Sequence, residues 1–120
     1  MFIRIVLAAL LLGFTTACSS SSSPSTPTPS GSAVSVSIVS GASTMTTSAY
    51  SPNPITVAVG GTVTWTNNDS TAHTATANGG TFSSGTIAPN GKFSMTFPSA
   101  GSFPYRCTFH PGMVGTVTVQ

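Results

Sequence analysis

The sequence predicts an all-β domain that folds as a two-sheet sandwich with Greek-key connections. From residue 33 onward, apolar residues alternate with small polar ones, a pattern typical of strands that bury one face. Clusters of Gly, Pro, Asn and Asp separate these alternating runs, and no stretch among them shows the apolar spacing of an amphipathic helix. About seven short strands in a chain of this size favour a sandwich of antiparallel strands.

The expected strands are defined by apolar residues that alternate with polar neighbours. In chain order these residues are Val34, Val36 and Ile38; Ile55, Val57 and Val59; Val63 and Trp65; Phe93, Met95 and Phe97; Phe103, Tyr105 and Cys107; and Val117 and Val119. Turns are expected between these runs, at 51–54, 60–61, 67–69, 78–80, 89–91 and 98–101.

Residues 1–17 are predicted to be a signal peptide that is removed on export. The apolar run 5–14 follows Arg4 and is about half as long as a membrane-spanning helix needs to be. Small residues then precede Cys18, which resembles the lipobox of bacterial lipoproteins and implies cleavage before Cys18 and a lipid on it. Lipoproteins usually have a large aliphatic residue where this chain has Thr15, so an ordinary signal peptide cleaved near Ala17 is the alternative. In both cases the chain leaves the cytoplasm.

Residues 18–32 are predicted to be a lipidated Cys18 followed by a disordered tether. The segment 19–32 contains Ser, Thr, Pro and Gly alone, so it buries too little apolar surface to offset the entropy cost of ordering. Residues 33–120 then remain as one folded domain, near the lower end of what a single core supports.

Composition excludes several classes of function. Charged residues make up 3% of the chain, against about 25% in ordinary soluble domains. Asp69 is the single acidic residue, so sites that need paired carboxylates, as in glycosidases, aspartic proteases and two-metal enzymes, are excluded. Beyond residue 20 the basic residues are Lys92 and Arg106, too few for binding nucleic acid. The chemistry must come from two His, two Cys and four Met.

The spacing Cys107-x-x-His110-x-x-Met113 places three possible metal ligands in one predicted loop, and His73 offers a fourth. Thiolate, imidazole and thioether together suit copper better than calcium or magnesium, and two His, one Cys and a weak axial Met form blue-copper electron-transfer sites. Taken singly, each residue has another explanation. Cys107 could be a small buried side chain or pair with Cys18, a Met usually fills a core, and a lone His usually lies on the surface.

Two segments resemble the cupredoxins of the plastocyanin, pseudoazurin and amicyanin group, and the resemblance covers essentially all of residues 33–120. Residues 51–69 resemble the strands that lead to the first His ligand, and residues 101–119 resemble the Cys-His-Met loop and last strand. The compact gap between His110 and Met113 is most similar to amicyanin. The resemblance implies one type 1 copper ion, with His73, Cys107 and His110 as equatorial ligands and Met113 as the axial one.

Three positions depart from the usual pattern of the family. Thr74 replaces an Asn that ties the first ligand to the Cys loop in relatives, and we expect Thr74 to supply a shorter hydrogen bond. Phe109 stands where relatives often have Pro. Arg106 replaces the Tyr that plastocyanins use as a lateral electron port, and alternation predicts Tyr105 and Cys107 on the buried side with Arg106 facing outward.

The expected function is transfer of single electrons between redox proteins outside the cytoplasm, and not catalysis. Partners are expected to dock on an apolar face around His110 to which Pro89 contributes, and the protein is expected to be a monomer held at a membrane by a lipid on Cys18. The main alternative is a periplasmic protein for copper delivery or resistance. A metal-free sandwich for adhesion or assembly, and a hydrolase built from Asp69, His73 and a Ser, are further alternatives.

Overall fold

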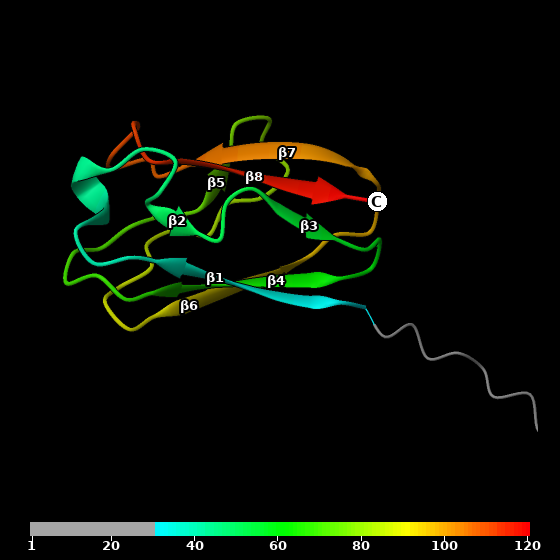
Figure 1. Cartoon of the computed structure of the whole chain (residues 1–120), viewed down its shortest axis with the longest axis horizontal. Coiled ribbons are helices and arrows are strands. Elements are labelled where there is room, and N and C mark those ends of the chain that lie inside the picture. Colours follow the sequence, from blue (N-terminus) through cyan, green and yellow to red (C-terminus); the bar gives the residue numbers. More distant parts are fainter. Residues whose placement is uncertain (1–30) are drawn as a thin grey trace, which may run out of the picture.

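A computed structural model describes residues 31–120, which form strands and one short 3-10 turn (Figure 1). In chain order the elements are β1 (Ala33–Ile38), η1 (Ala42–Thr44), β2 (Tyr50–Ser51), β3 (Ile55–Val57), β4 (Thr62–Asn67), β5 (Thr76–Ala77), β6 (Lys92–Thr96), β7 (Gly101–Arg106) and β8 (Val114–Val119). No helix in this described part is long and apolar enough to cross a membrane. The predicted signal peptide, Cys18 and the tether up to residue 30 lie outside the described residues.

The strands form two four-stranded sheets that pack face to face (Figure 1). One sheet has the order β2-β1-β4-β6 and the other has the order β3-β8-β7-β5. Neighbouring strands in each sheet are therefore often distant in sequence, as Greek-key connections require. The predicted all-β sandwich is confirmed.

The expectation of purely antiparallel sheets is wrong. β1 runs parallel to β4, with Val34 opposite Val63, and β3 runs parallel to β8, with Ile55 opposite Val117. The other strand pairs in the described residues are antiparallel. Alternation of apolar residues reports which face of a strand is buried, and it carries no information about the direction of the neighbouring strand.

The expected strands are present, with differences at their ends and in the shortest elements. The strand predicted through Val59 ends at Val57, and the Val59 side chain is 49% exposed in the turn that follows. The two-residue strands β2 and β5 were not predicted, because two residues are too few to show an alternating pattern.

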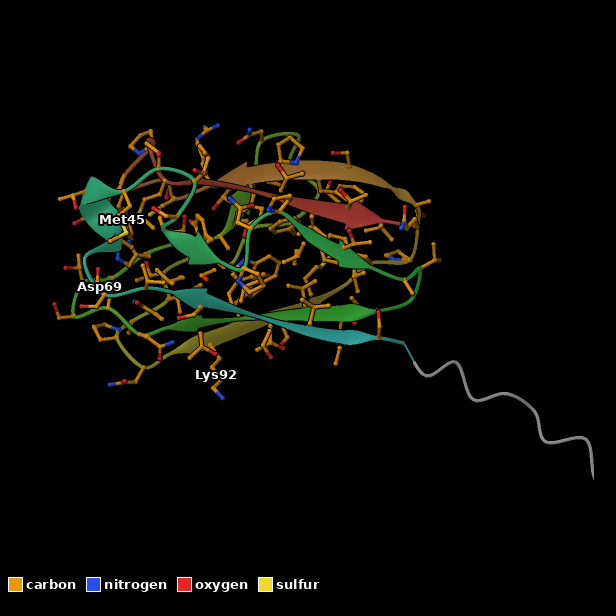
Figure 2. The ribbon with its side chains drawn as sticks, viewed as in Figure 1. Met45, Asp69 and Lys92 are labelled. Atoms are coloured by element: carbon orange, nitrogen blue, oxygen red, sulfur yellow. The ribbon has the colours of Figure 1, made fainter. Side chains whose placement is uncertain are left out.

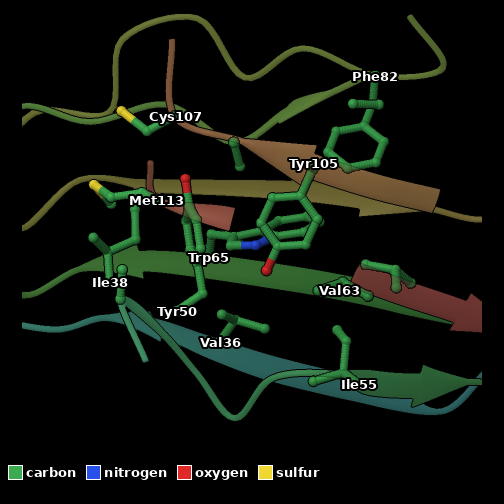
Figure 3. Close-up of a cluster of buried hydrophobic side chains, with 14 of the residues drawn as sticks. Val36, Ile38, Tyr50, Ile55, Val63, Trp65, Phe82, Tyr105, Cys107 and Met113 are labelled. Atoms are coloured by element: carbon green, nitrogen blue, oxygen red, sulfur yellow. The ribbon is translucent and has the colours of Figure 1, made fainter. Parts of the chain in front are cut away.

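An aromatic cluster joins the two sheets in the core (Figure 3). Trp65 of β4 lies with its ring centroid 5.5 Å from that of Tyr105 on β7, and Tyr50 of β2 lies 4.8 Å from Tyr105. Both contacts are edge-on, which is a favoured geometry for aromatic rings and adds about 0.5–1.5 kcal/mol per pair to the burial itself. Because this cluster links residues from both sheets, it fixes how the sheets lie over one another.

One end of the sandwich gathers the loops that carry the candidate ligands. β1, β4 and β7 all end there and β8 begins there, at the end of the molecule opposite the C-terminus (Figure 1). The loop 107–113 joins β7 to β8, and the segment 68–75 joins β4 to β5. Antiparallel pairing of β7 with β8 holds both ends of the 107–113 loop.

Candidate metal centre

The four predicted ligands come from two loops whose ends are held by strands. Cys107 directly follows β7, Met113 directly precedes β8, and His110 lies between them. The amide N–H of Cys107 donates to the carbonyl of Met113 at 3.1 Å, and the amide of Met113 donates to the carbonyl of His110 at 2.9 Å. His73 is held by a two-way backbone bridge to Ile87. Backbone hydrogen bonds within the protein therefore hold the loop positions of these predicted ligands.

Two imidazole nitrogens face the thiol of Cys107. The Nδ1 atoms of His73 and His110 each lie 3.8 Å from Cys107 Sγ, and the three donor atoms all lie within 4.8 Å of one another. A metal bonded at about 2.0 Å to N and about 2.3 Å to S, with a trigonal angle, separates those atoms by about 3.7 Å. The observed spacing therefore fits one ion between the three side chains.

Met113 lies at the same end of the core. Its side chain is completely buried, and its sulfur points to the same side of the cluster as that of Cys107 (Figure 3). The structure thus brings all four predicted ligands together, while the axial role of Met113 and the metal-binding role of each side chain stay predictions.

One backbone hydrogen bond reaches the sulfur of Cys107, and a second one ties the donating residue, Thr74, to the Cys loop. The amide N–H of Thr74 donates to Cys107 Sγ at 3.3 Å, and the hydroxyl of Thr74 accepts the amide N–H of Thr108 at 2.8 Å. The expectation that Thr74 replaces the usual Asn as the tie to the Cys loop is confirmed. A donor on the sulfur disperses thiolate charge and so contributes to the redox properties of a bound metal.

Asp69, which the sequence suggested only as part of a hydrolase site, is a further functional candidate. Its Oδ2 accepts a hydrogen bond from Nε2 of His73 at 2.8 Å, and the carboxylate is almost completely buried. The hydrogen bond from His73, and next the amide N–H of Gly41, hold the pKa of Asp69 below its usual value. The second ring nitrogen of His73 faces Cys107 rather than a serine hydroxyl, so the geometry does not favour a hydrolase. The sequence feature that could have indicated this contact is the position of Asp69, the one acidic residue of the chain, four residues before His73.

Two buried tyrosines, Tyr50 and Tyr105, pack against each other in the core, and Tyr50 reaches the backbone next to His73. Tyr50 donates its hydroxyl proton to the carbonyl of Thr74, next to His73, and burial raises the pKa of Tyr50 far above its usual value. Burial also raises the pKa of Tyr105 to about 12. Both phenols therefore stay neutral at physiological pH.

The outer rim of the site is apolar and exposed. His110 is half-buried, Pro111 and Gly112 are exposed, and Phe109 is 52% exposed. Pro89 is also exposed, in the loop after Ile87, the residue that pairs with His73. As predicted, Tyr105 and Cys107 are buried, whereas Arg106 points outward and donates to the side chain of Asn78.

The donor set fits copper. A buried thiolate, two imidazoles and a thioether are soft or borderline ligands, whereas the single carboxylate is already bonded to His73. Among residues 31–120, His73, Cys107 and His110 are the one group of three or more His, Cys, Asp or Glu side chains spaced to hold a metal ion.

Comparisons with known proteins place the chain in one family. The family described as a cupredoxin-like domain matches residues 6–119. An amicyanin from Paracoccus denitrificans is 36% identical over 76 residues, which cover 59% of this chain and 58% of that protein. A plastocyanin from Scenedesmus fuscus is 33% identical over 84 residues, covering 59% of this chain and 86% of that protein.

A solved structure extends the match to three dimensions. The purple cupredoxin from Nitrosopumilus maritimus shares 35% sequence identity with a TM-score of 0.67, and the match covers 72% of this chain and 99% of that one. The family match spans nearly the whole chain, and this structure is matched over almost all of its length. The chain therefore belongs to the cupredoxin-like domain family.

Proposed function

We propose that this protein is a type 1 copper protein that carries single electrons between redox partners outside the cytoplasm. It holds one copper ion with His73, Cys107, His110 and Met113. The observation that carries the proposal is the convergence of two imidazole nitrogens on one buried thiol, each at 3.8 Å. A metal-free adhesion module gives no physical reason for these three side chains to converge in its interior.

Copper bound there would supply one-electron chemistry by alternating between Cu(I) and Cu(II). The protein's own residues limit how far the ligands move during that change. Cys107 and Met113 are tied to each other through a backbone hydrogen bond, and His73 is fixed by its bridge to Ile87. Thr74 connects the two loops. A site held in this way needs little rearrangement, and small rearrangement favours fast electron transfer.

The first test is an absorption and electron paramagnetic resonance spectrum of the Cu(II)-loaded protein. Because one relative is a purple cupredoxin, the criterion is an intense thiolate-to-Cu(II) band rather than a blue colour. We expect Cys107→Ser to abolish this band while the apo domain stays folded, since Ser is close to Cys in volume but a poor copper ligand near neutral pH. An intense band that persists in Cys107→Ser would show that another group binds the metal.

The same sample separates electron transfer from copper delivery or resistance. A carrier gives a reversible potential and keeps its metal in both oxidation states, which cyclic voltammetry and metal analysis measure. A delivery protein would release copper to a chelator in one oxidation state. The tight ties between the loops support the carrier.

We propose that the protein is not an enzyme. Its two histidines, His73 and His110, both lie in the candidate copper site. Copper oxidases and nitrite reductases of related fold need further His ligands for a second copper. Assays of the copper-loaded protein for oxidase and nitrite reductase activity test this expectation, and turnover by either assay would contradict it.

Location and partners follow from the N-terminus and the rim. The predicted signal sequence and Cys18 support a lipid-anchored position facing the periplasm or exterior. The exposed rim of Phe109, His110 and Pro111 supports transient docking of redox proteins on a monomer. We expect Cys18→Ala to move the protein out of the membrane fraction without changing its copper spectrum, measured by fractionation and mass spectrometry. Membrane retention with an unprocessed mass would mean that residues 5–14 act as the anchor.

A further inference from the structure

The chain has one acidic residue, and the structure places it against a ligand histidine instead of on the surface. Asp69 is 7% exposed and lies in the segment between β4 and β5, at the end of the sandwich that carries the copper site (Figure 2). A buried carboxylate is costly unless hydrogen bonds compensate it. The partners of this carboxylate therefore indicate what it does.

Every partner of the Asp69 carboxylate is a hydrogen-bond donor. Oδ1 accepts the amide N–H of Gly41 at 3.1 Å and that of Ser70 at 2.8 Å, while Oδ2 accepts from Nε2 of His73 at 2.8 Å. Gly41 has φ of 77°, a conformation that favours glycine, and it aims its N–H from the loop after β1. An Asn side chain at position 69 would not reproduce this arrangement, since its NH2 group would meet one of these donors.

The position of the carboxylate is itself fixed by buried hydrogen bonds. The amide N–H of Asp69 donates to Oδ1 of Asn67, whose NH2 group donates to the carbonyls of Thr71 and Ile87. Asn67 is completely buried at the end of β4. The strand end, the loop and the carboxylate thus form one connected network that reaches His73.

The hydrogen bond decides which nitrogen of His73 can bind a metal. A carboxylate has no proton to donate, so the shared proton is on Nε2 of His73. In the neutral ring, Nδ1 then carries the free lone pair, and this atom faces Cys107 Sγ at 3.8 Å. The contact presets the tautomer that a metal needs.

We propose that Asp69 is a positioning residue of the copper centre, which fixes the tautomer and ring orientation of His73 and stabilises Cu(II) relative to Cu(I). Carboxylate-to-histidine contacts of this kind orient metal ligands and raise their basicity. The negative charge lies behind the ligand, and it favours the more highly charged oxidation state of the metal. This inference rests on the proposed function for its redox part, but the tautomer of His73 can be measured separately.

The first experiment locates the ring proton of His73 by NMR in the metal-free full chain with 15N-labelled histidine, because a metal bonded to Nδ1 would by itself force the proton onto Nε2. We expect a proton on Nε2 that exchanges with water more slowly than the ring proton of His110, whose half-buried side chain is an internal reference. A proton on Nδ1, or exchange as fast as that of His110, would overturn the proposal. This measurement needs no variant, so it decides the question even if changes at Asp69 prevent folding.

The second experiment compares variants by reduction potential and copper affinity. In Asp69→Asn we expect copper affinity to fall about 10–100-fold and the potential to rise. If Cu(II) loses about tenfold more affinity than Cu(I), the potential rises by about 59 mV. Asp69→Glu keeps a carboxylate, so it should recover part of the loss. Unchanged affinity and potential in a folded Asp69→Asn variant would overturn the proposal.

A matched control separates the buried contact from net charge. In the double variant Asp69→Asn/Ser70→Asp the net charge is conserved, while the carboxylate moves to the exposed position of Ser70. We expect the reduction potential of the double variant to stay as high as that of Asp69→Asn. A return of the potential to that of the unmodified protein would show that net charge, and not the buried contact, sets it. If the unmodified protein lacks an intense thiolate band, the proposed function fails. If the band is normal and Asp69→Asn has no effect, this inference alone fails.

Discussion

At the scale of single residues, Cys107 and Met113 occupy opposite ends of the same loop but have different expected roles. Both side chains are completely buried. The sulfur of Cys107 has two imidazole nitrogens and a backbone N–H around it. Met113 has its backbone held at both N–H and carbonyl, which leaves its thioether to occupy the end of the core.

Met113→Leu should keep copper bound and raise the reduction potential. The axial thioether is a weak donor that favours Cu(II), and Leu has a similar volume without that donor. A tenfold relative loss of Cu(II) affinity corresponds to a rise of about 59 mV, measured by voltammetry. An unchanged potential would mean that Met113 only packs in the core. Met95→Leu, at a half-buried position on β6, is the matched control and should leave the potential unchanged.

At the scale of elements, the pairing of β7 with β8 keeps the site in place. Tyr105 lies opposite Gly115 in this ladder, two residues before Cys107. The ring of Tyr105 lies directly over Gly115, so a Cβ there would overlap the ring and its hydroxyl. The smallest residue at position 115 therefore lets the aromatic cluster approach the backbone of β8, and the ligand loop begins from this contact.

Gly115→Ala should destabilise the fold and disturb the copper site together. Overpacking a core typically costs about 1–3 kcal/mol of unfolding free energy, and here the overlap is with a rigid ring. Chemical denaturation of the apo protein measures the cost, and the Cu(II) spectrum measures the disturbance. Gly79→Ala is the control, because a Cβ at Gly79 has no atom within 4 Å and should change stability by less than about 0.5 kcal/mol. A Gly115→Ala variant as stable as this control would contradict the packing argument.

At the scale of the whole molecule, His110 is the most exposed of the four predicted ligands. His110 is half-buried, whereas His73 and Cys107 are completely buried. The exposed Phe109 and Pro111 flank it. Arg106 lies on the outer face of β7 next to Cys107, and its charged side chain provides no aromatic path for electrons there. Apolar surface allows close approach of a partner, so we expect electrons to pass at His110.

Pro111→Glu should slow electron self-exchange between Cu(I) and Cu(II) copies of the protein by about tenfold or more. Two copies must meet rim to rim, and the substitution places like charges in that contact, which costs several kcal/mol before screening by salt. NMR line broadening in mixtures of the two oxidation states measures the rate. Arg106→Gln, at a position exposed like Pro111, should change mainly how the self-exchange rate depends on salt concentration. A larger loss in Arg106→Gln at high salt would place the electron port beside Cys107.

Local sequence patterns were sufficient to predict the sandwich and the loop from Cys107 to Met113, and the resemblance to cupredoxins added His73 to the predicted ligands. Alternation such as Val63 and Trp65 depends on which face of a strand is buried, and the spacing from Cys107 to Met113 depends on ligand chemistry. Both are short-range properties of the chain. The fold class and the gathering of the four predicted ligands were therefore accessible before the structure.

Tertiary structure decided what depends on contacts between distant segments. The parallel pairing of β1 with β4 and the short strands β2 and β5 join residues far apart in sequence. Asp69 shows the difference most clearly. The sequence showed one acid near His73, but the buried donors that converge on its carboxylate come from the loop after β1 as well as from its own loop. A carboxylate's role is set by its donors and its burial, and only the folded chain brings these together.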